Sequence, residues 1–248
     1  MSQHRNRDDF SRFLVHLTRD YDGDTSAANL RSMLKTKKIQ ARNAHCLFSP
    51  KIKSIGFSST LQKKFNTACF TEVPLNQLRH LTQNITGRRI QLKPHGLVFW
   101  KHDMLEQDTN PAVYINAIAK GKGLREFLLA EFDRHFDDQK QYKSFTKAYG
   151  DKADSIIEYY SLINIISSRM DFSWEREWRH TGDFRFEFNQ LVAIIAPNPS
   201  RFRSGYKKHF SLKHWKQIER IPVISPEWNY EQLVEDLTHR LWECGNNS

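Results

Sequence analysis

The pattern of hydrophobic and polar positions predicts strands and helices that alternate along the chain. Short apolar runs bounded by polar or turn residues are typical of buried strands. Such runs occur at residues 13–18, 68–73, 96–101, 112–118, 191–196 and 221–224. In 184–188, three phenylalanines alternate with Arg185 and Glu187, which predicts a half-buried strand.

Apolar residues at helical spacing predict the helices. The first begins after Thr25 or Ser26, either of which can cap it, and runs to about Lys37. Its predicted buried residues are Leu30, Met33 and Leu34. A second helix is expected after Pro74, and further helices at 124–136, 152–170 and 227–242. The predicted buried stripe of 124–136 consists of Leu124, Phe127, Leu128 and Phe132.

Two segments lack a clear period. Residues 43–66 are predicted to form a loop or lid, and the polar residues 137–150 a flexible connection. No internal repeat or linker divides the chain, so the pattern predicts a single α+β domain over residues 1–248.

The chain is basic, with 38 Lys and Arg against 28 Asp and Glu and a net charge of +10. A basic surface attracts phosphates, which favours a nucleic acid or nucleotide partner, although solubility alone explains the charge equally well. Basic groups occur at Lys35-Lys37-Lys38, Arg88-Arg89, Arg201-Arg203 and Lys207-Lys208. Each group by itself is better explained as a solvated face.

The cysteines and the chain ends predict a cytoplasmic protein. Cys46, Cys69 and Cys244 are odd in number and form no CxxC pair, so a disulfide framework is not expected and a reducing compartment fits best. The first residues have no apolar core of a signal peptide, and the longest apolar run, 191–196, is far shorter than the roughly 20 residues of a membrane helix. No membrane association is expected.

Residues 171–180, Asp-Phe-Ser-Trp-Glu-Arg-Glu-Trp-Arg-His, are the strongest candidate for a catalytic segment. Because side chains alternate along a strand, Glu175, Glu177 and Arg179 are expected on one face. Two carboxylates about 7 Å apart on one face can both reach a small sugar. The alternative is a structural edge strand in which Glu and Arg neutralise each other.

Two further positions have both a functional and a structural interpretation. His16 lies within an apolar strand, where a histidine is more often a core residue than a catalytic one. Thr71 and Glu72 precede a predicted helix start that favours anions, but they are equally explained as helix caps. The His and Cys residues show no zinc-binding spacing, so no metal is predicted.

The ordered motifs VHLT, NLRSML, CFTEVPL, GLVFW, NPAVYI and DFSWEREWRH resemble the AbiGi family of bacterial abortive-infection proteins. More remotely, they resemble DarT-type and other ADP-ribosyltransferases. The resemblance covers about Phe13 to Pro197. It implies an ADP-ribosyltransferase-like fold, with a split mixed or antiparallel β core flanked by helices. Residues 12–197 would form the catalytic-like core and residues 198–248 a C-terminal helical extension.

Transferases of this fold carry a His or Arg on the first strand, a Tyr, Ser or Thr on a second strand, and a Glu on a later strand. Arginine-modifying members often show Glu-x-Glu. The resemblance implies that Glu177 stabilises a cationic ribose and that Glu175 orients or deprotonates the acceptor. The resemblance also implies four NAD-binding positions. These are His16 and Thr18 on the first strand, and Thr71 on the second, for which Tyr114 is an equal alternative.

The implied reaction cleaves the nicotinamide–ribose bond of NAD, which is a substrate, and passes ADP-ribose to a nucleic acid or protein acceptor. Members of the family are often antitoxins, so the alternative is a non-catalytic antitoxin or nucleic-acid-binding module on the same fold. A cognate antitoxin or partner protein is also a candidate partner. A metal-dependent nuclease ranks third, because Asp171, Glu175 and Glu177 show no recognised nuclease spacing.

Overall fold

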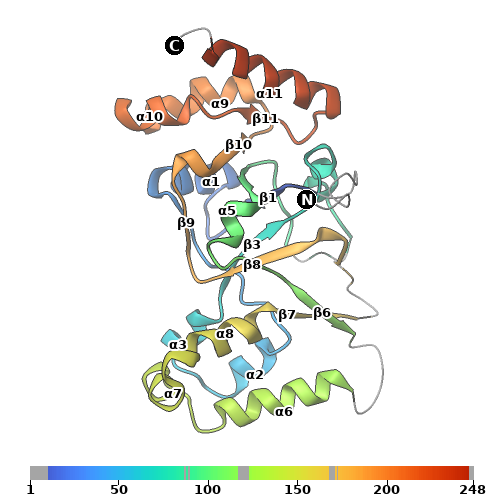
Figure 1. Ribbon diagram of the computed structural model, residues 1–248, viewed down its shortest axis with the longest axis vertical. Coiled ribbons are helices and arrows are strands. Elements are labelled where there is room, and N and C mark those ends of the chain that lie inside the picture. Colours follow the sequence, from blue (N-terminus) through green and yellow to red (C-terminus); the bar gives the residue numbers. More distant parts are fainter. Residues whose placement is uncertain are drawn as a thin grey trace. The chain divides into compact units, whose positions relative to one another are not determined.

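The computed structural model describes residues 11–86, 88, 90–116, 123–167, 171 and 173–245 (Figure 1). Helices and strands are mixed along the chain, which confirms the predicted α+β class. A seven-stranded mixed sheet has the strand order β11-β10-β4-β1-β3-β8-β5, and two further sheets pair β2 with β9 and β6 with β7. The ADP-ribosyltransferase-like arrangement stays a prediction.

The bounds of the elements are as follows. The strands are β1 (Phe13–Leu17), β2 (Lys38–Ile39), β3 (Thr67–Thr71), β4 (Gly96–Trp100), β5 (Asn110–Pro111), β6 (Val113–Asn116), β7 (Ile163–Ile166), β8 (Glu177–Thr181), β9 (Phe184–Arg185), β10 (Leu191–Ile195) and β11 (Val223–Ile224). The α-helices are α1 (Ser26–Thr36), α2 (Ser49–Ser54), α3 (Ser59–Lys64), α4 (Leu78–Thr82), α5 (Lys101–Leu105), α6 (Leu124–Phe136), α7 (Tyr142–Tyr149), α8 (Ala153–Leu162), α9 (Pro199–Tyr206), α10 (Leu212–Ile218) and α11 (Tyr230–Gly245).

The chain forms two compact units. The first consists of Met1–Lys38, Phe70–Gln107 and Arg185–Ser248, and the second of Ile39–Cys69 and Asp108–Phe184. Each unit therefore joins segments that are distant in sequence. The predicted single domain over residues 1–248 stays a prediction.

The core of the first unit lies around β1, β4 and β10. β4 pairs antiparallel with β1 and with β10, while β11 lies parallel to β10. The buried cluster on these strands and the adjoining segments comprises Val15, Leu17, Val73, Leu78, Leu81, Val98, Ala193, Ile195, Ile224 and Leu233. Removal of this apolar surface from water is the main force that holds the strands together.

Gly96 sets the close approach of β4 to β1 at His16. A Cβ atom built on Gly96 would lie 2.3 Å from the carbonyl oxygen of His16, a distance that real Cβ atoms do not adopt. His16 is opposite Leu97 in the antiparallel register, so the glycine is next to the strand position of the predicted NAD ligand. A larger residue would push the strands apart.

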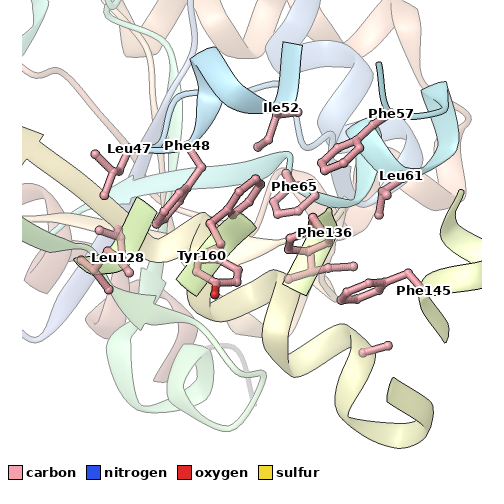
Figure 2. Close-up of a cluster of buried hydrophobic side chains, with 14 of the residues drawn as sticks. Leu47, Phe48, Ile52, Phe57, Leu61, Phe65, Leu128, Phe136, Phe145 and Tyr160 are labelled. Carbon is pink, nitrogen blue, oxygen red and sulfur yellow. The ribbon is translucent and has the colours of Figure 1, made fainter. Parts of the chain in front are cut away.

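The second unit has an aromatic core, shown in Figure 2. Phe48 stacks on Phe132 with ring centroids 4.7 Å apart, and Phe136 stacks on Phe145 at 4.5 Å. The rings come from α6, α7 and the segment before α2. Offset aromatic pairs add roughly 0.5–1.5 kcal/mol beyond the area that they bury.

The first predicted helix is confirmed in detail. α1 begins at Ser26, and the hydroxyl of Thr25 accepts a hydrogen bond from the backbone N–H of Ala28. Thr25 is therefore the N-cap, and Leu30, Met33 and Leu34 are buried as predicted. The strand predictions at 13–18, 68–73, 96–101 and 191–196 correspond to β1, β3, β4 and β10.

The prediction that residues 43–66 and 137–150 are irregular is wrong, because both segments contain helices with buried residues. Residues 43–66 contain α2 and α3, and residues 137–150 contain α7. Ile52, Leu61 and Phe145 from these helices are almost fully buried. Each helix has eight residues or fewer, so a periodic signal is short and burial against the aromatic core stabilises it.

The predicted helix 152–170 is also wrong in its second half. α8 ends at Leu162, and β7 follows at once, parallel to β6. Ile163, Ile165 and Ile166 favour a strand because they are β-branched, but their spacing also continues the helical stripe. Strand pairing decides the conformation. Residues 168–170 of this prediction, and 117–118 of the predicted strand 112–118, lie outside the described residues.

Two predicted faces need correction. In α6, Leu128 and Phe132 are buried, but Leu124 and Phe127 are 58% and 59% exposed. The buried stripe instead continues to Phe136. The predicted strand at 184–188 ends at Arg185 as β9, although all three phenylalanines of this segment are buried and the intervening Arg185 and Glu187 are exposed.

Candidate functional site

A left-handed turn precedes the strand that carries the candidate catalytic carboxylate. Residues Ser173–Glu175 form a 3₁₀ turn, Arg176 has a φ of 47°, and β8 begins at Glu177. A positive φ in a residue with a Cβ atom costs about 1 kcal/mol or more. The extended path expected over residues 174–180 is therefore wrong for 174–176 and confirmed from Glu177 onwards. Glu175 is not on a common strand face with Glu177.

Glu177 and Arg179 form a buried ion pair within β8. Arg179 Nε donates to Glu177 Oε1 at 3.1 Å, and its Nη2 donates to Oε2 at 3.0 Å. The arginine side chain is 1% exposed and that of Glu177 15%. The remaining terminal nitrogen donates to the carbonyl oxygen of Ser161 at 2.6 Å. The shared face predicted for these two residues is confirmed.

Two more side chains, one on β6 and one on β7, donate hydrogen bonds to the carboxylate of Glu177. Tyr114 and Asn164 are opposite each other in the parallel register of these strands. The Tyr114 hydroxyl donates to Glu177 Oε2 at 2.9 Å, and Asn164 Nδ2 donates to the same oxygen at 3.5 Å. The structure thus brings together Tyr114 and Glu177, which are 63 positions apart.

The electrostatics of this cluster keep Glu177 ionised. Burial by itself raises the pKa of Glu177, but the charge of Arg179 and the hydrogen bonds from Arg179, Cys69 and Tyr114 outweigh it and hold the pKa below 4.5. The pKa of Tyr114 is raised, first by burial and then by the charge of Glu177, with a smaller contribution from Glu175. At neutral pH the site is therefore a carboxylate that accepts from a neutral phenol.

Cys69, on β3, is part of this cluster. Asn43 Nδ2 donates to its sulfur at 2.9 Å, and burial together with the negative charge of Glu177 raises the pKa of the thiol to about 12. Burial also raises the pKa of Cys46. Both cysteines are therefore thiols, not thiolates, at neutral pH, and neither forms a disulfide.

Sequence reasoning missed Asn164, Ser161 and Cys69 as parts of the site. The first two are in the segment predicted as a continuous helix, and Cys69 has no spacing that marks it. The sequence predicts the face of Arg179 and, in the structural alternative, its pairing with Glu, but no part for it in the catalytic site. Its position two residues after Glu177 on a strand was the available signal.

The other predicted NAD-binding residues belong to the first unit. His16 is half-buried on β1, and its ring contacts Phe70 edge-on with centroids 5.7 Å apart. The buried Thr18 hydroxyl donates to the carbonyl oxygen of Ser26 at 3.1 Å. His16 and Glu177 belong to different units, so their predicted meeting at one substrate stays a prediction.

Thr71 and Glu72 are not helix caps, which corrects that alternative. The Thr71 hydroxyl accepts from the backbone N–H of Val73 at 3.2 Å. The carboxylate of Glu72 accepts from Lys101 Nζ at 2.7 Å, and both side chains are 15% exposed or less. The 3₁₀ turn that follows has Pro74 at its N-cap and no side-chain cap.

Comparisons of this chain with models of known protein families, with curated proteins and with solved structures found no match. In the described part of the chain, no helix combines the length and apolar character that crossing a membrane requires. Within the same residues, no three His, Cys, Asp or Glu side chains gather as a possible metal site. The proposed function therefore depends on the geometry around Glu177.

Proposed function

We propose that the chain is an NAD-dependent ADP-ribosyltransferase that acts as a toxin or phage-defence effector. The observation that carries the proposal is the 2.9 Å hydrogen bond from Tyr114 to Glu177, a carboxylate that Arg179 keeps ionised. Cleavage of the nicotinamide–ribose bond leaves positive charge on the ribose, and a fixed carboxylate in a water-poor site stabilises it by several kcal/mol.

Each group has a distinct role in this proposal. Glu177 accepts a hydrogen bond from a ribose hydroxyl and stabilises the cationic sugar. Arg179 is a positioning residue that holds the carboxylate in one orientation through two parallel hydrogen bonds. Thr71, or Tyr114 as its equal alternative, lines the nicotinamide pocket. Glu175 orients or deprotonates the acceptor.

His16, Thr18 and Thr71 are assigned to the NAD-binding part of the site by the resemblance alone. The acceptor is a nucleic acid or a protein. As nicotinamide leaves with the bonding electron pair, an acceptor oxygen or nitrogen attacks the ribose carbon and loses its proton to Glu175. The proposed place of action is the cytoplasm.

The test is transfer of label from NAD carrying a labelled adenine to DNA, RNA or cell extract. Replacement of one such stabilising group typically lowers turnover about 100- to 1,000-fold, and we expect this for Glu177→Gln. Glu106→Gln removes an exposed carboxylate of the first unit and is the matched control. Label transfer that Glu177→Gln leaves unchanged would refute the assignment.

Tyr114→Phe removes the hydrogen bond to Glu177 but keeps the ion pair with Arg179. It therefore tests the effect of this hydrogen bond on turnover in a chain that still folds. We expect turnover to fall about tenfold while the unfolding midpoint changes little, because only one hydrogen bond is removed. Growth arrest on expression, relieved by Glu177→Gln, would support the toxin role. No arrest would argue against it.

A second function, a non-catalytic antitoxin or nucleic-acid-binding module, is favoured by a specific observation. Both oxygens of Glu177 already accept hydrogen bonds from Arg179, which is also how a purely structural ion pair is built. Calorimetric titration of the wild-type chain with NAD distinguishes the two functions. An absence of both binding and cleavage would favour the module.

A further inference from the structure

The first unit carries a basic surface without acidic residues that the proposed catalytic cluster does not use. Helix α1 contains Arg31 and Lys35, and its sequence has no Asp or Glu. Residues 199–218, which include α9 and α10, also contain no Asp or Glu. Their basic residues are Arg201, Arg203, Lys207, Lys208, Lys213 and Lys216.

Contacts place residues 206–214 along one face of α1. The Tyr206 hydroxyl donates to the carbonyl oxygen of Ala27 at 3.1 Å, and the Arg31 guanidinium lies 5.6 Å from the centre of the Tyr206 ring. Further along the helix, His214 Nε2 lies 3.2 Å from the carbonyl oxygen of Leu34. Two segments about 180 positions apart thus form one surface in this unit.

We use the name basic surface for Arg31, Lys35, Lys207, Lys208 and Lys213. Arg31 and Lys35 are one helical turn apart on α1, and therefore on the same side of it. The four lysines are exposed, and Arg31 is half-buried. Arg203 is not included, because it donates to the carbonyl oxygen of Glu219 at 2.7 Å at the end of α10.

Positive charge accumulates here without compensation. Among the residues that the structure describes, no carboxylate forms an ion pair with any member of the basic surface. Lysines of the second unit differ, since Lys51 and Lys64 pair with Asp133 and Asp154. The pKa of His209 lies below its usual value because of slight desolvation and the nearby charges of Arg31 and Lys208.

We propose that the basic surface binds the phosphate backbone of a nucleic acid without sequence preference. A cluster of uncompensated lysines repels itself, and a chain of phosphates relieves this repulsion while it releases counterions. Long flexible lysines fit a repeating point charge better than they fit base edges, which are read by bidentate groups. The surface therefore positions a nucleic acid and does not read it.

The chemistry of the surface favours a nucleic acid over an anionic membrane. Helices that lie on a membrane expose a row of large apolar residues beside their basic residues. Among the described residues of α1 and 199–218, Leu212 is the one large apolar side chain with substantial exposure, at 67%. Tyr206, Phe202 and Trp215 are buried.

The test is fluorescence anisotropy with a labelled 20-nucleotide single strand and a labelled 20-base-pair duplex, without NAD. The variant Lys207→Ala, Lys208→Ala, Lys213→Ala should bind about tenfold more weakly. On the duplex, the slope of log affinity against log salt concentration should become less negative by about 2 to 3, because each lost phosphate contact reduces the slope by about 1. The matched control is Lys53→Ala, Lys63→Ala, Lys147→Ala, which removes the same charge from exposed positions of the second unit.

Equal losses in the two triple variants would overturn the proposal, because net charge alone would then explain binding. So would binding to vesicles with 30% phosphatidylserine in the absence of nucleic acid binding, which would identify a membrane surface. The inference goes beyond the proposed enzymatic activity. Because no NAD is present, the wild type and the Lys53→Ala, Lys63→Ala, Lys147→Ala control should bind nucleic acid whether or not the enzymatic proposal holds.

Discussion

At the scale of single residues, the decisive feature is a carboxylate and a guanidinium removed from water together. Arg179 is 1% exposed, and its three nitrogen donors are used by Glu177 and by the carbonyl oxygen of Ser161. A pair of this kind adds little net stability when it is intact, because desolvation offsets the attraction. Loss of one partner is costly, since it leaves the other charged and buried.

This asymmetry predicts the effect of Arg179→Met. The substitution leaves Glu177 without its counter-charge, and we expect the free energy of unfolding to fall by about 3 kcal/mol or more. The double variant Arg179→Met, Glu177→Gln removes both charges and should recover a large part of the loss. Urea denaturation of the single and double variants measures both effects. A double variant less stable than Arg179→Met would contradict the prediction.

The same pair predicts how stability depends on pH. The pKa of Glu177 is lower in the folded chain than its usual 4.5, so the unfolded chain binds the proton more tightly. The contribution of Glu177 to stability is therefore complete above about pH 4.5 and is lost as the pH falls through the lowered folded pKa. Denaturation between pH 6 and pH 3 should show a smaller loss in the double variant than in the wild type. If stability falls with pH equally in the wild type and the double variant, the ion pair is not the cause of the loss at low pH.

At the scale of elements, the buried face of α6 was only partly predictable. The helix has the predicted bounds, but its first turn and Phe127 face solvent. An apolar stripe indicates which side of a helix is buried, but packing selects which residues along that stripe are covered. Here the aromatic rings of Phe48 and Phe145 contact the face formed by Phe132 and Phe136.

Two phenylalanines of this one helix form a matched pair for a test. Phe132 is fully buried and Phe127 is 59% exposed. We expect Phe132→Ala to lower the free energy of unfolding by about 3–5 kcal/mol through lost burial and the cavity left behind. Phe127→Ala should change it by about 0.5 kcal/mol or less. Thermal and urea unfolding would show the contrast, and similar effects at both positions would contradict the assigned face.

At the scale of the whole molecule, the two proposals rely on different units. Glu177, Arg179 and Tyr114 belong to the second unit, and the basic surface belongs to the first. Among the described residues, the two sets have no hydrogen-bond partner in common. The two activities are therefore expected to be separable by substitution.

Separability predicts a specific pattern in an assay that measures both activities. The triple variant of the basic surface should still cleave NAD in the absence of nucleic acid, but transfer to a nucleic acid acceptor should fall by about the same factor as its affinity, roughly tenfold. Nicotinamide release and labelled acceptor are quantified in the same reaction. If the triple variant also loses NAD cleavage, the basic surface is part of the catalytic machinery.

Local sequence was sufficient to determine the α+β class, a helix start at Thr25 or Ser26, the buried residues of α1 and the strands β1, β3, β4 and β10. These features depend on interactions within one turn of helix or on a short apolar run, which neighbouring residues specify. The shared face of Glu177 and Arg179 follows from strand geometry alone.

Tertiary structure alone decided that residues 43–66 contain helices, that α8 ends at Leu162, and that Tyr114, Asn164 and Cys69 surround Glu177. In each case the stabilising partner is distant in sequence: an aromatic core, a parallel strand, or a charge that must be neutralised when it is buried. A short segment contains no information about such partners, because the energy that selects its conformation arises only when the chain has folded.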